Sequence, residues 1–136
     1  QQVSLAGAVI VSTPQDIALL DARKGLQMFR KTDVPILGII ENMSYYECPS
    51  CNHRENIFDT GGGERAAEKY EVPFLGSIPL DVKVRLGGDQ GSPIVASENQ
   101  NPVAQAFKEA ARNVALQIAI VNSSAPTSVP ELKIIE

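Results

Sequence analysis

Three short apolar runs, separated by more polar stretches, constrain the fold of this chain more than any other feature. They are LAGAVIVS at 5–12, VPILGII at 34–40 and VPFLGSIP at 72–79. Successive residues are apolar and several are β-branched, which is typical of strands buried on both faces. Strands of this kind that alternate with helices predict a parallel sheet with crossover helices, an α/β fold in three layers.

The segments between the runs carry helix signals. After the first run, Thr13 is a candidate N-cap, Pro14 suits the first helical position, and Asp16 stands three residues after Thr13, as in a capping box. These signals predict a helix over about 14–31. A second helix is predicted over about 62–70, with glycines at its entrance.

The remaining segments are predicted as follows. LDVKVRLGGDQGSP reads as a short helix that Gly87 and Gly88 end, and PIVAS reads as a short extended segment. Pro102 begins a last helix whose apolar side chains recur at steps of three and four and so share one face. They are Val103, Phe107, Ala110, Val114, Ile118 and Val121. Residues 122–136 are rich in Ser and Pro and predict a flexible tail, which leaves 1–121 as the domain.

The first residues predict an incomplete domain. The chain opens with QQVSLAG, without an initiator methionine, and runs almost directly into its first predicted strand. Three strands also make a thin sheet for a doubly wound domain. We therefore expect a fragment or processed product whose upstream part supplies further strands.

Charge and hydropathy exclude several classes of partner. The formal net charge is −4 and no run of Lys or Arg stands out, which argues against nucleic-acid binding. The apolar runs are too short to span a bilayer, and residues 1–12 lack a secretory signal pattern. We expect neither a nucleic acid nor a membrane as partner. Cysteine usage, two residues in a single C-x-x-C, favours a reducing compartment.

The C-x-x-C motif, Cys48 and Cys51, lies in a predicted loop after the second strand. Its spacing lets two sulfurs converge on one metal, so a metal or cluster site is favoured over a redox pair or two inert thiols. A thioredoxin-like pair would open a helix, and NHREN has no helical period. His53 is a possible third ligand, although a solvated loop histidine is the simpler interpretation.

Two cysteines supply only half of a four-ligand site. If these thiolates alone bind, two copies related by a two-fold axis would present four to one shared centre. Four thiolates suit zinc or a four-iron cluster equally, and the sequence does not separate them.

The glycine-rich TGGGER at 60–65 is better explained as a helix entry than as a phosphate loop. It lacks the Lys-Ser/Thr ending of G-x-x-x-x-G-K-[ST], with Glu64 and Arg65 in its place. No G-K-[ST] occurs in the 136 residues, so the chain by itself has no Walker A loop and no catalytic residue is assigned.

Asn42 and Pro79 follow the predicted second and third strands. Ligands of open parallel sheets bind outside the carboxyl ends of the strands. The Asn42 amide can donate and accept, so it suits the edge of a purine, and capping of the loop is an equally good explanation.

Several motifs together resemble the Mrp/ApbC family of MinD-like P-loop ATPases that carry iron–sulfur clusters. The resemblance extends over about 5–120 and rests on five segments in the family's order. They are STPQDIALLDARKGLQMF, GIIENMS, CPSC, IFDTGGGERAA and LGSIPLDVKVRLGGDQGSPIV.

This resemblance implies a function and a set of site residues. Cys48 and Cys51 would ligate a labile four-iron four-sulfur cluster shared with the same pair of a second subunit. Asn42 would contact adenine, with Pro79, Leu80 and Asp81 lining that pocket, and the intact protein would bind ATP with Mg²⁺. A homodimer would pass the cluster to apo-proteins, in the cytoplasm or, as in mitochondrial relatives, in the matrix.

The chain departs from the family in one large respect. It has neither the K-G-G-x-G-K-[ST] loop nor the D-x-P-P-G segment of the family's N-terminal half, so the chain alone is expected to lack ATPase activity. Two alternatives stay open. One is a structural or regulatory dimer stapled by zinc, and the other is a MinD-like partitioning ATPase, against which the cysteines and the ending PELKIIE argue.

Overall fold

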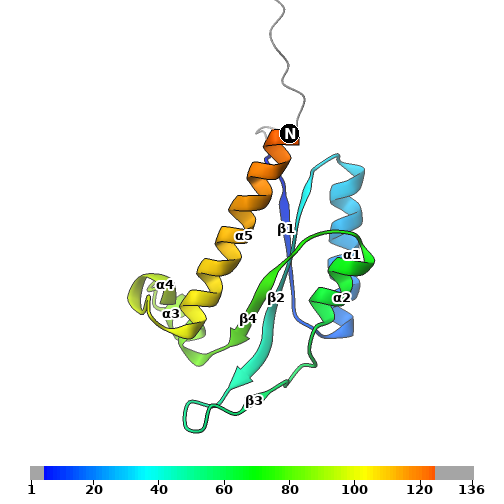
Figure 1. Cartoon of the computed structure of the whole chain (residues 1–136). Helices are drawn as coiled ribbons and strands as arrows, with labels where there is room; N and C mark the ends of the chain where they lie inside the picture. Colours follow the sequence, from blue (N-terminus) through cyan, green and yellow to red (C-terminus); the bar gives the residue numbers. More distant parts are fainter. Residues whose placement is uncertain (1–4, 125–136) are drawn as a thin grey trace, which may run out of the picture.

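The computed structural model describes residues 5–124 and has a parallel sheet at its centre (Figure 1). The central strand is β2 (Ile36–Glu47), flanked by β1 (Ala8–Ser12) and β4 (Phe74–Leu80), both parallel to it. A two-residue strand, β3 (Arg54–Glu55), runs antiparallel to the end of β2. The predicted parallel α/β arrangement is confirmed, with one antiparallel strand added.

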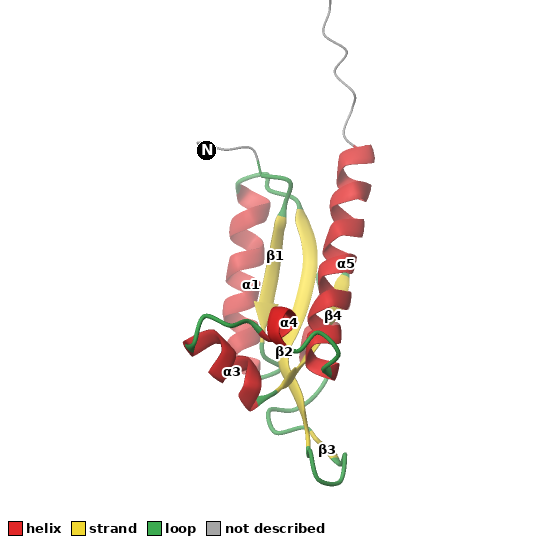
Figure 2. Ribbon diagram, turned by 90° about the vertical axis from the view of Figure 1, so that its left-hand side faces the viewer, coloured by secondary structure: helices red, strands yellow, loops and turns green. Residues whose placement is uncertain are grey.

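Helices cover both faces of the sheet, as Figures 1 and 2 show. The helices α1 (Asp16–Lys31) and α2 (Gly62–Lys69) lie on one face, and α5 (Pro102–Ser124) lies on the other. The short helices α3 (Val82–Asp89) and α4 (Ile94–Ser97) lie beyond the carboxyl end of β4. Within residues 5–124, no helix combines the length and hydropathy that a membrane span requires.

Within residues 5–124, the core consists of two clusters, one on each face of the sheet. Ile10 and Ile39 pack with Leu26 of α1 and Ala67 of α2. On the other face, Ile78 packs with residues of α4 and α5, among them Ile94, Val103, Ala104 and Ala110. Ile39 lies in the first cluster and its neighbour Ile40 packs against the second, which explains why the apolar run of β2 shows no alternation.

The first predicted helix is confirmed, but its predicted start is wrong. The helix begins at Asp16, and Gln15 at the N-cap makes no side-chain cap hydrogen bond. Thr13 does not cap, because its hydroxyl donates to the Gln15 side chain at 3.1 Å. Pro14 is fully buried and lies against the start of α2, where a Cβ on Gly62 would come within 2.6 Å of its carbonyl oxygen. Packing between elements thus decides the role of Pro14.

The second strand is longer than predicted. Residues ENMS do not open a loop, because the strand continues to Glu47. Both edges find partners there, since Tyr46 pairs with Leu80 of β4 and with Glu55 of β3. The pairing with β4 is irregular between Asn42 and Tyr46, where Met43 has a φ of 54°.

Three further differences fall in the C-terminal part. Gly87 and Gly88 lie inside α3, which ends at Asp89, and the left-handed residue beyond it is Gly91 with a φ of 67°. The predicted extended PIVAS is helical over Ile94–Ser97, because Ile94 turns into the core. The predicted face of the last helix is confirmed, with Val103 and Ala110 buried. The predicted tail overlaps α5 at 122–124, and 125–136 lie outside the described residues.

A buried carboxylate joins the sheet to α2. Glu41 of β2 is only 1% exposed. Its Oε2 accepts a hydrogen bond from the Gly63 N–H at 2.6 Å, and its Oε1 accepts one from the Ser44 hydroxyl. An acceptor suits the start of a helix, where backbone N–H groups have no partner within the helix. The Glu41 side chain therefore holds the start of α2 on the sheet and also contacts the irregular part of β2.

Two adjacent glycines of α3 give a matched test of packing. A Cβ on Gly87 would lie 2.5 Å from the Ser92 carbonyl oxygen, whereas a Cβ on Gly88 meets nothing within 4 Å. We expect Gly88→Ala to raise the free energy of unfolding by about 0.5–1 kcal/mol through helix propensity. Gly87→Ala should lower it by about 1–3 kcal/mol through overpacking. Urea unfolding of both variants measures this, and effects of the same sign would contradict the close contact.

Replacement of Glu41 tests the buried carboxylate. Glu41→Ala leaves the Gly63 N–H and the Ser44 hydroxyl without their acceptor and opens a cavity, so unfolding should become easier by about 2–4 kcal/mol. Glu41→Gln keeps one carbonyl acceptor and a similar volume and should cost about 1 kcal/mol. Equal losses in the two variants, measured by urea unfolding, would mean that the hydrogen bonds contribute little.

Candidate functional site

The C-x-x-C motif forms the tip of the hairpin that joins β2 to β3. The Cys48 N–H donates to the His53 carbonyl at 2.9 Å, and the Asn52 N–H donates to the Cys48 carbonyl at 2.8 Å. Asn52 has a φ of 55°, a left-handed conformation that asparagine adopts more readily than most residues. The predicted loop position of the motif is confirmed, and the loop is closed by its own backbone.

Both cysteines carry free thiols, Cys48 partly buried and Cys51 exposed. The backbone N–H groups of Ser50 and Cys51, with a further contribution from the Cys51 side chain, lower the pKa of the Cys48 thiol below its ordinary value. Hydrogen bonds of this kind stabilise a thiolate, which is the form that ligates metal. No helix starts at the motif, since β3 follows it, so the thioredoxin-like alternative is disfavoured.

The motif supplies two ligands. His53 is exposed on the same loop. Among residues 5–124, no three side chains of His, Cys, Asp or Glu come together in a way that could hold a metal ion. A four-ligand centre at this hairpin would therefore need donors from outside the described part of the chain.

Arg54 of β3 braces the base of the hairpin. Its guanidinium lies 4.6 Å from the centroid of the Tyr45 ring, and its Nε is 2.7 Å from Oε2 of Glu47. The hydrogen bond with Glu47 raises the pKa of Arg54 further above its ordinary value. Because all of these groups are solvent-accessible, the ion pair aligns the two strands more than it stabilises the protein.

A cavity of about 290 Å³ lies beside the hairpin and brings together predicted metal and nucleotide residues. Cys48 lines it from the hairpin, and Pro79, Leu80 and Asp81 line it from the end of β4. Asn42 and Cys51 are not among its lining residues. The cavity thus lies at the carboxyl end of the sheet, the usual position for ligands in parallel α/β proteins.

Two of the predicted nucleotide residues, Asn42 and Asp81, make structural hydrogen bonds, and two, Asn42 and Pro79, lie within strands rather than after them. Asn42 lies within β2 rather than after it, and its Oδ1 accepts from the Met43 N–H at 3.0 Å. Pro79 likewise lies inside β4 and is buried. Asp81 caps α3, since its Oδ1 accepts from the Lys83 N–H at 2.6 Å.

Lys83 and Asn101 line the same cavity and were not found from sequence. Lys83 pairs with Glu98 at 2.7 Å, and this hydrogen bond lowers the pKa of Glu98 and raises that of Lys83. The Asn101 Oδ1 accepts from the Val103 N–H at 2.9 Å and caps α5. Asparagine directly before Pro102 is a recognisable helix start, so this residue could have been found.

The glycine cluster is confirmed as a helix entry. Gly61 has a φ of 68° and precedes α2, which begins at Gly62. Gly62 packs closely on Pro14, and a Cβ on Gly63 would lie 3.0 Å from the Cβ of Glu41. The glycines allow α2 to approach the sheet closely.

Comparison with known families and sequences gives consistent matches. Residues 1–115 match the family model described as ParA, NUBPL iron-transfer P-loop NTPase. The iron-sulfur cluster carrier protein of Haemophilus influenzae is 46% identical over 129 residues, which are 95% of this chain and 35% of that protein. The iron-sulfur cluster transfer protein NUBPL of Dictyostelium discoideum is 44% identical over 123 residues, 90% of this chain and 38% of that protein. The chain thus spans just over a third of the length of these relatives.

Solved structures share the fold. The nucleotide-binding protein of Archaeoglobus fulgidus in complex with ADP matches with a TM-score of 0.60 at 37% identity, covering 75% of this chain and 40% of that one. The septum site-determining protein MinD of Pyrococcus horikoshii, complexed with Mg-ADP, matches with a TM-score of 0.65 at 28% identity, covering 85% and 44%. The expected MinD-like P-loop NTPase fold is confirmed.

The environment of Cys48 predicts an acidic thiol. In the Cys51→Ser variant, Cys48 is the only thiol, so the pH dependence of its alkylation by iodoacetamide reports its pKa. We expect this pKa to lie below the ordinary value of 9.0, because the backbone N–H groups at positions 50 and 51 stabilise the thiolate. The lower pKa means more thiolate at neutral pH and faster alkylation than in concentrated guanidinium. Identical profiles in the folded and unfolded chain would contradict the hydrogen-bonded geometry.

Proposed function

The chain belongs to the ParA family of P-loop NTPases, in its NUBPL iron-transfer group, and on that premise we propose that it carries a labile iron–sulfur cluster and passes it to apo-proteins. Cys48 and Cys51 hold the cluster at the hairpin tip. The cluster is cargo rather than a resident cofactor. The two thiols bind it and release it. The curated relatives named as iron-sulfur cluster carrier and transfer proteins support this assignment.

The observation that carries the proposal is the pair of accessible thiols at the end of a protruding hairpin. Cys51 is exposed, Cys48 is partly so, and backbone N–H groups favour the Cys48 thiolate. Exposed thiolates at a tip can exchange a cluster with an incoming protein, whereas a cluster buried among four ligands of one chain would be held permanently.

We further propose that the cluster is of the four-iron four-sulfur type and is shared by two copies of the chain. Two thiolates from each copy complete the usual set of four ligands. The lack of further donors near the hairpin within residues 5–124 supports sharing. His53 has no role in ligation.

The nucleotide part of the proposal concerns the longer protein. ATP with Mg²⁺ would bind there, with Asn42, Pro79, Leu80 and Asp81 near the adenine. The position of the last three at the carboxyl end of β4 supports this, as does the ADP in the similar Archaeoglobus fulgidus structure. This sequence contains no G-K-[ST], so we assign no hydrolytic residue to it. We propose the cytoplasm, or the mitochondrial matrix in a eukaryote, as the compartment.

Anaerobic reconstitution with iron and sulfide tests the proposal. The wild-type chain should bind about four iron and four sulfide per two chains, with a broad absorbance at about 400 nm and a doubled mass on size-exclusion light scattering. Cys48→Ala with Cys51→Ala should lose both the absorbance and the mass change, since the ligands are gone. His53→Ala is the matched control on the same loop and should behave as wild type.

The same experiment separates the alternatives. Equal iron and sulfide in the double-cysteine variant would overturn the ligand assignment, and a cluster on single chains would overturn sharing. Stoichiometric zinc without the visible absorbance in anaerobically purified protein would favour a zinc-stapled dimer.

A further inference from the structure

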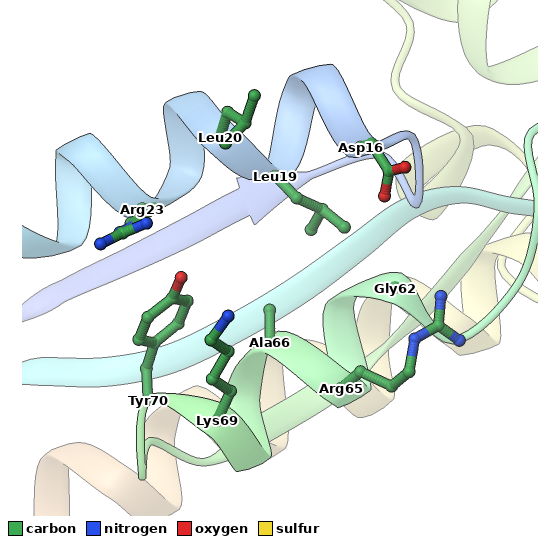
Figure 3. Close-up of a pocket in the computed structure, with 9 residues that line it drawn as sticks. All are labelled: Asp16, Leu19, Leu20, Arg23, Gly62, Arg65, Ala66, Lys69 and Tyr70. Carbon is green, nitrogen blue, oxygen red and sulfur yellow. The ribbon is translucent and has the colours of Figure 1, made fainter.

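A second cavity, of about 320 Å³, lies between α1 and α2, away from the cysteine hairpin (Figure 3). We call it the α1–α2 groove. Leu19 and Ala66 form its apolar part, and Arg23, Arg65, Lys69 and Tyr70 surround it. Figure 3 shows Lys69 and Tyr70 rising toward α1, with Arg23 reaching from α1 into the same gap.

The groove is locally basic although the chain is acidic overall. Arg23 makes no ion pair with any carboxylate of residues 5–124, and Lys69 has only the Tyr70 ring, 5.9 Å from its centroid. Arg65 donates to the Thr60 carbonyl at 2.8 Å and has a long contact of 3.4 Å with Asp59. Asp16, at one end, is the only acidic lining residue. A groove with this balance of charge complements an anionic ligand.

Apolar surface continues from the groove onto the outside of α1. Leu20, which lines the groove, is 53% exposed, and Ile17, one turn before it, is 72% exposed. Exposed apolar side chains grouped on one helix and bordered by cations differ from single scattered ones and are typical of binding surfaces. The ligand therefore needs apolar side chains as well as negative charge.

Contacts at both ends of the groove hold α1 and α2 together. At one end, the Arg30 Nη2 donates to the Tyr70 carbonyl at 2.6 Å and ties α1 to the end of α2. At the other end, Gly62 packs against the Pro14 carbonyl that precedes α1. A preformed groove saves the entropy of ordering and so favours binding.

The position of the groove relative to the sheet follows from the order of the elements. The helix α1 connects β1 to β2, and α2 lies between the hairpin and β4, so the groove lies over the central strand. Within residues 5–124, β1 and β4 are both edge strands of this sheet, and each pairs on one side only, with β2. The groove therefore lies away from both edges of the sheet.

We propose that the α1–α2 groove docks an acidic amphipathic segment of a partner protein. An apolar side chain of the segment lies between Leu19 and Ala66, and its carboxylates pair with Arg23 and Lys69. A helix laid in a groove with carboxylates along its edge meets both requirements. Peptide docking of this kind does not depend on cluster binding at Cys48 and Cys51.

The test uses the full chain and a fluorescein-labelled twelve-residue peptide built from repeats of Glu, Glu and Leu. Wild-type protein should bind it in fluorescence anisotropy, with amide NMR shifts at α1 and α2. Arg23→Glu with Lys69→Glu should weaken binding about tenfold or more. The matched control, Lys31→Glu with Arg112→Glu, makes the same change in net charge outside the groove and should stay within about twofold.

Three outcomes would overturn the proposal. The first is no binding by the wild type, and the second is equal weakening in both pairs of variants, since only overall charge would then matter. The third is equal binding of a peptide with Ser in place of Leu, or displacement of the peptide by inorganic phosphate, since the groove would then be a site for simple anions. Circular dichroism of each variant confirms that a loss does not come from unfolding.

Discussion

The rest of this structure depends on the two hydrogen bonds that the buried Glu41 carboxylate accepts. This carboxylate lies almost fully buried in the central strand and accepts from the start of α2 and from the Ser44 hydroxyl. The hydrogen bond from Gly63 holds α2 on the sheet, and the one from Ser44 holds the irregular part of β2. A buried carboxylate without partners would destabilise the fold, so both donors must be in place at once. The hairpin and the α1–α2 groove therefore share one anchor.

That anchor explains why the two candidate sites are separate yet fixed relative to each other. Beyond the irregular part, β2 continues far enough to pair with β3 and to carry Cys48 beyond the sheet. On the face of the sheet that α1 and α2 cover, Gly62 and Gly63 let α2 lie close to Pro14 and Glu41. In this position α2 forms one wall of the groove. A partner bound in the groove would leave the thiols of the hairpin uncovered. Capture of a partner and exchange of a cluster can thus use different surfaces of one rigid unit.

The sequence predicted the local features and missed those that depend on distant contacts. Apolar runs and helical periods were enough for the parallel sheet and for the buried face of α5, because both follow from burial patterns. The length of β2 was missed because two distant strands, β3 and β4, complete its pairing. Thr13 does not cap α1 because its hydroxyl donates to the Gln15 side chain, and Pro14 packs on α2 instead of beginning the helix. Gly87 lies inside α3, with the Ser92 carbonyl close to it. The role of Glu41 had no local signal, since a carboxylate after an apolar run also suits a loop.

The number of ligands in the hairpin bears on how a carrier can release its cargo. On the proposed function, each chain offers two thiolates, so neither copy can hold a four-ligand cluster alone. Within each chain, Arg54 contacts Tyr45 and Glu47 at the base of the hairpin and aligns its two strands. The cavity beside Cys48 is lined by Pro79, Leu80 and Asp81, so a nucleotide at the end of β4 would lie next to the base of the hairpin. On the proposed function, a change in the spacing of the two hairpins would then alter the hold on the cluster without a new ligand from either chain.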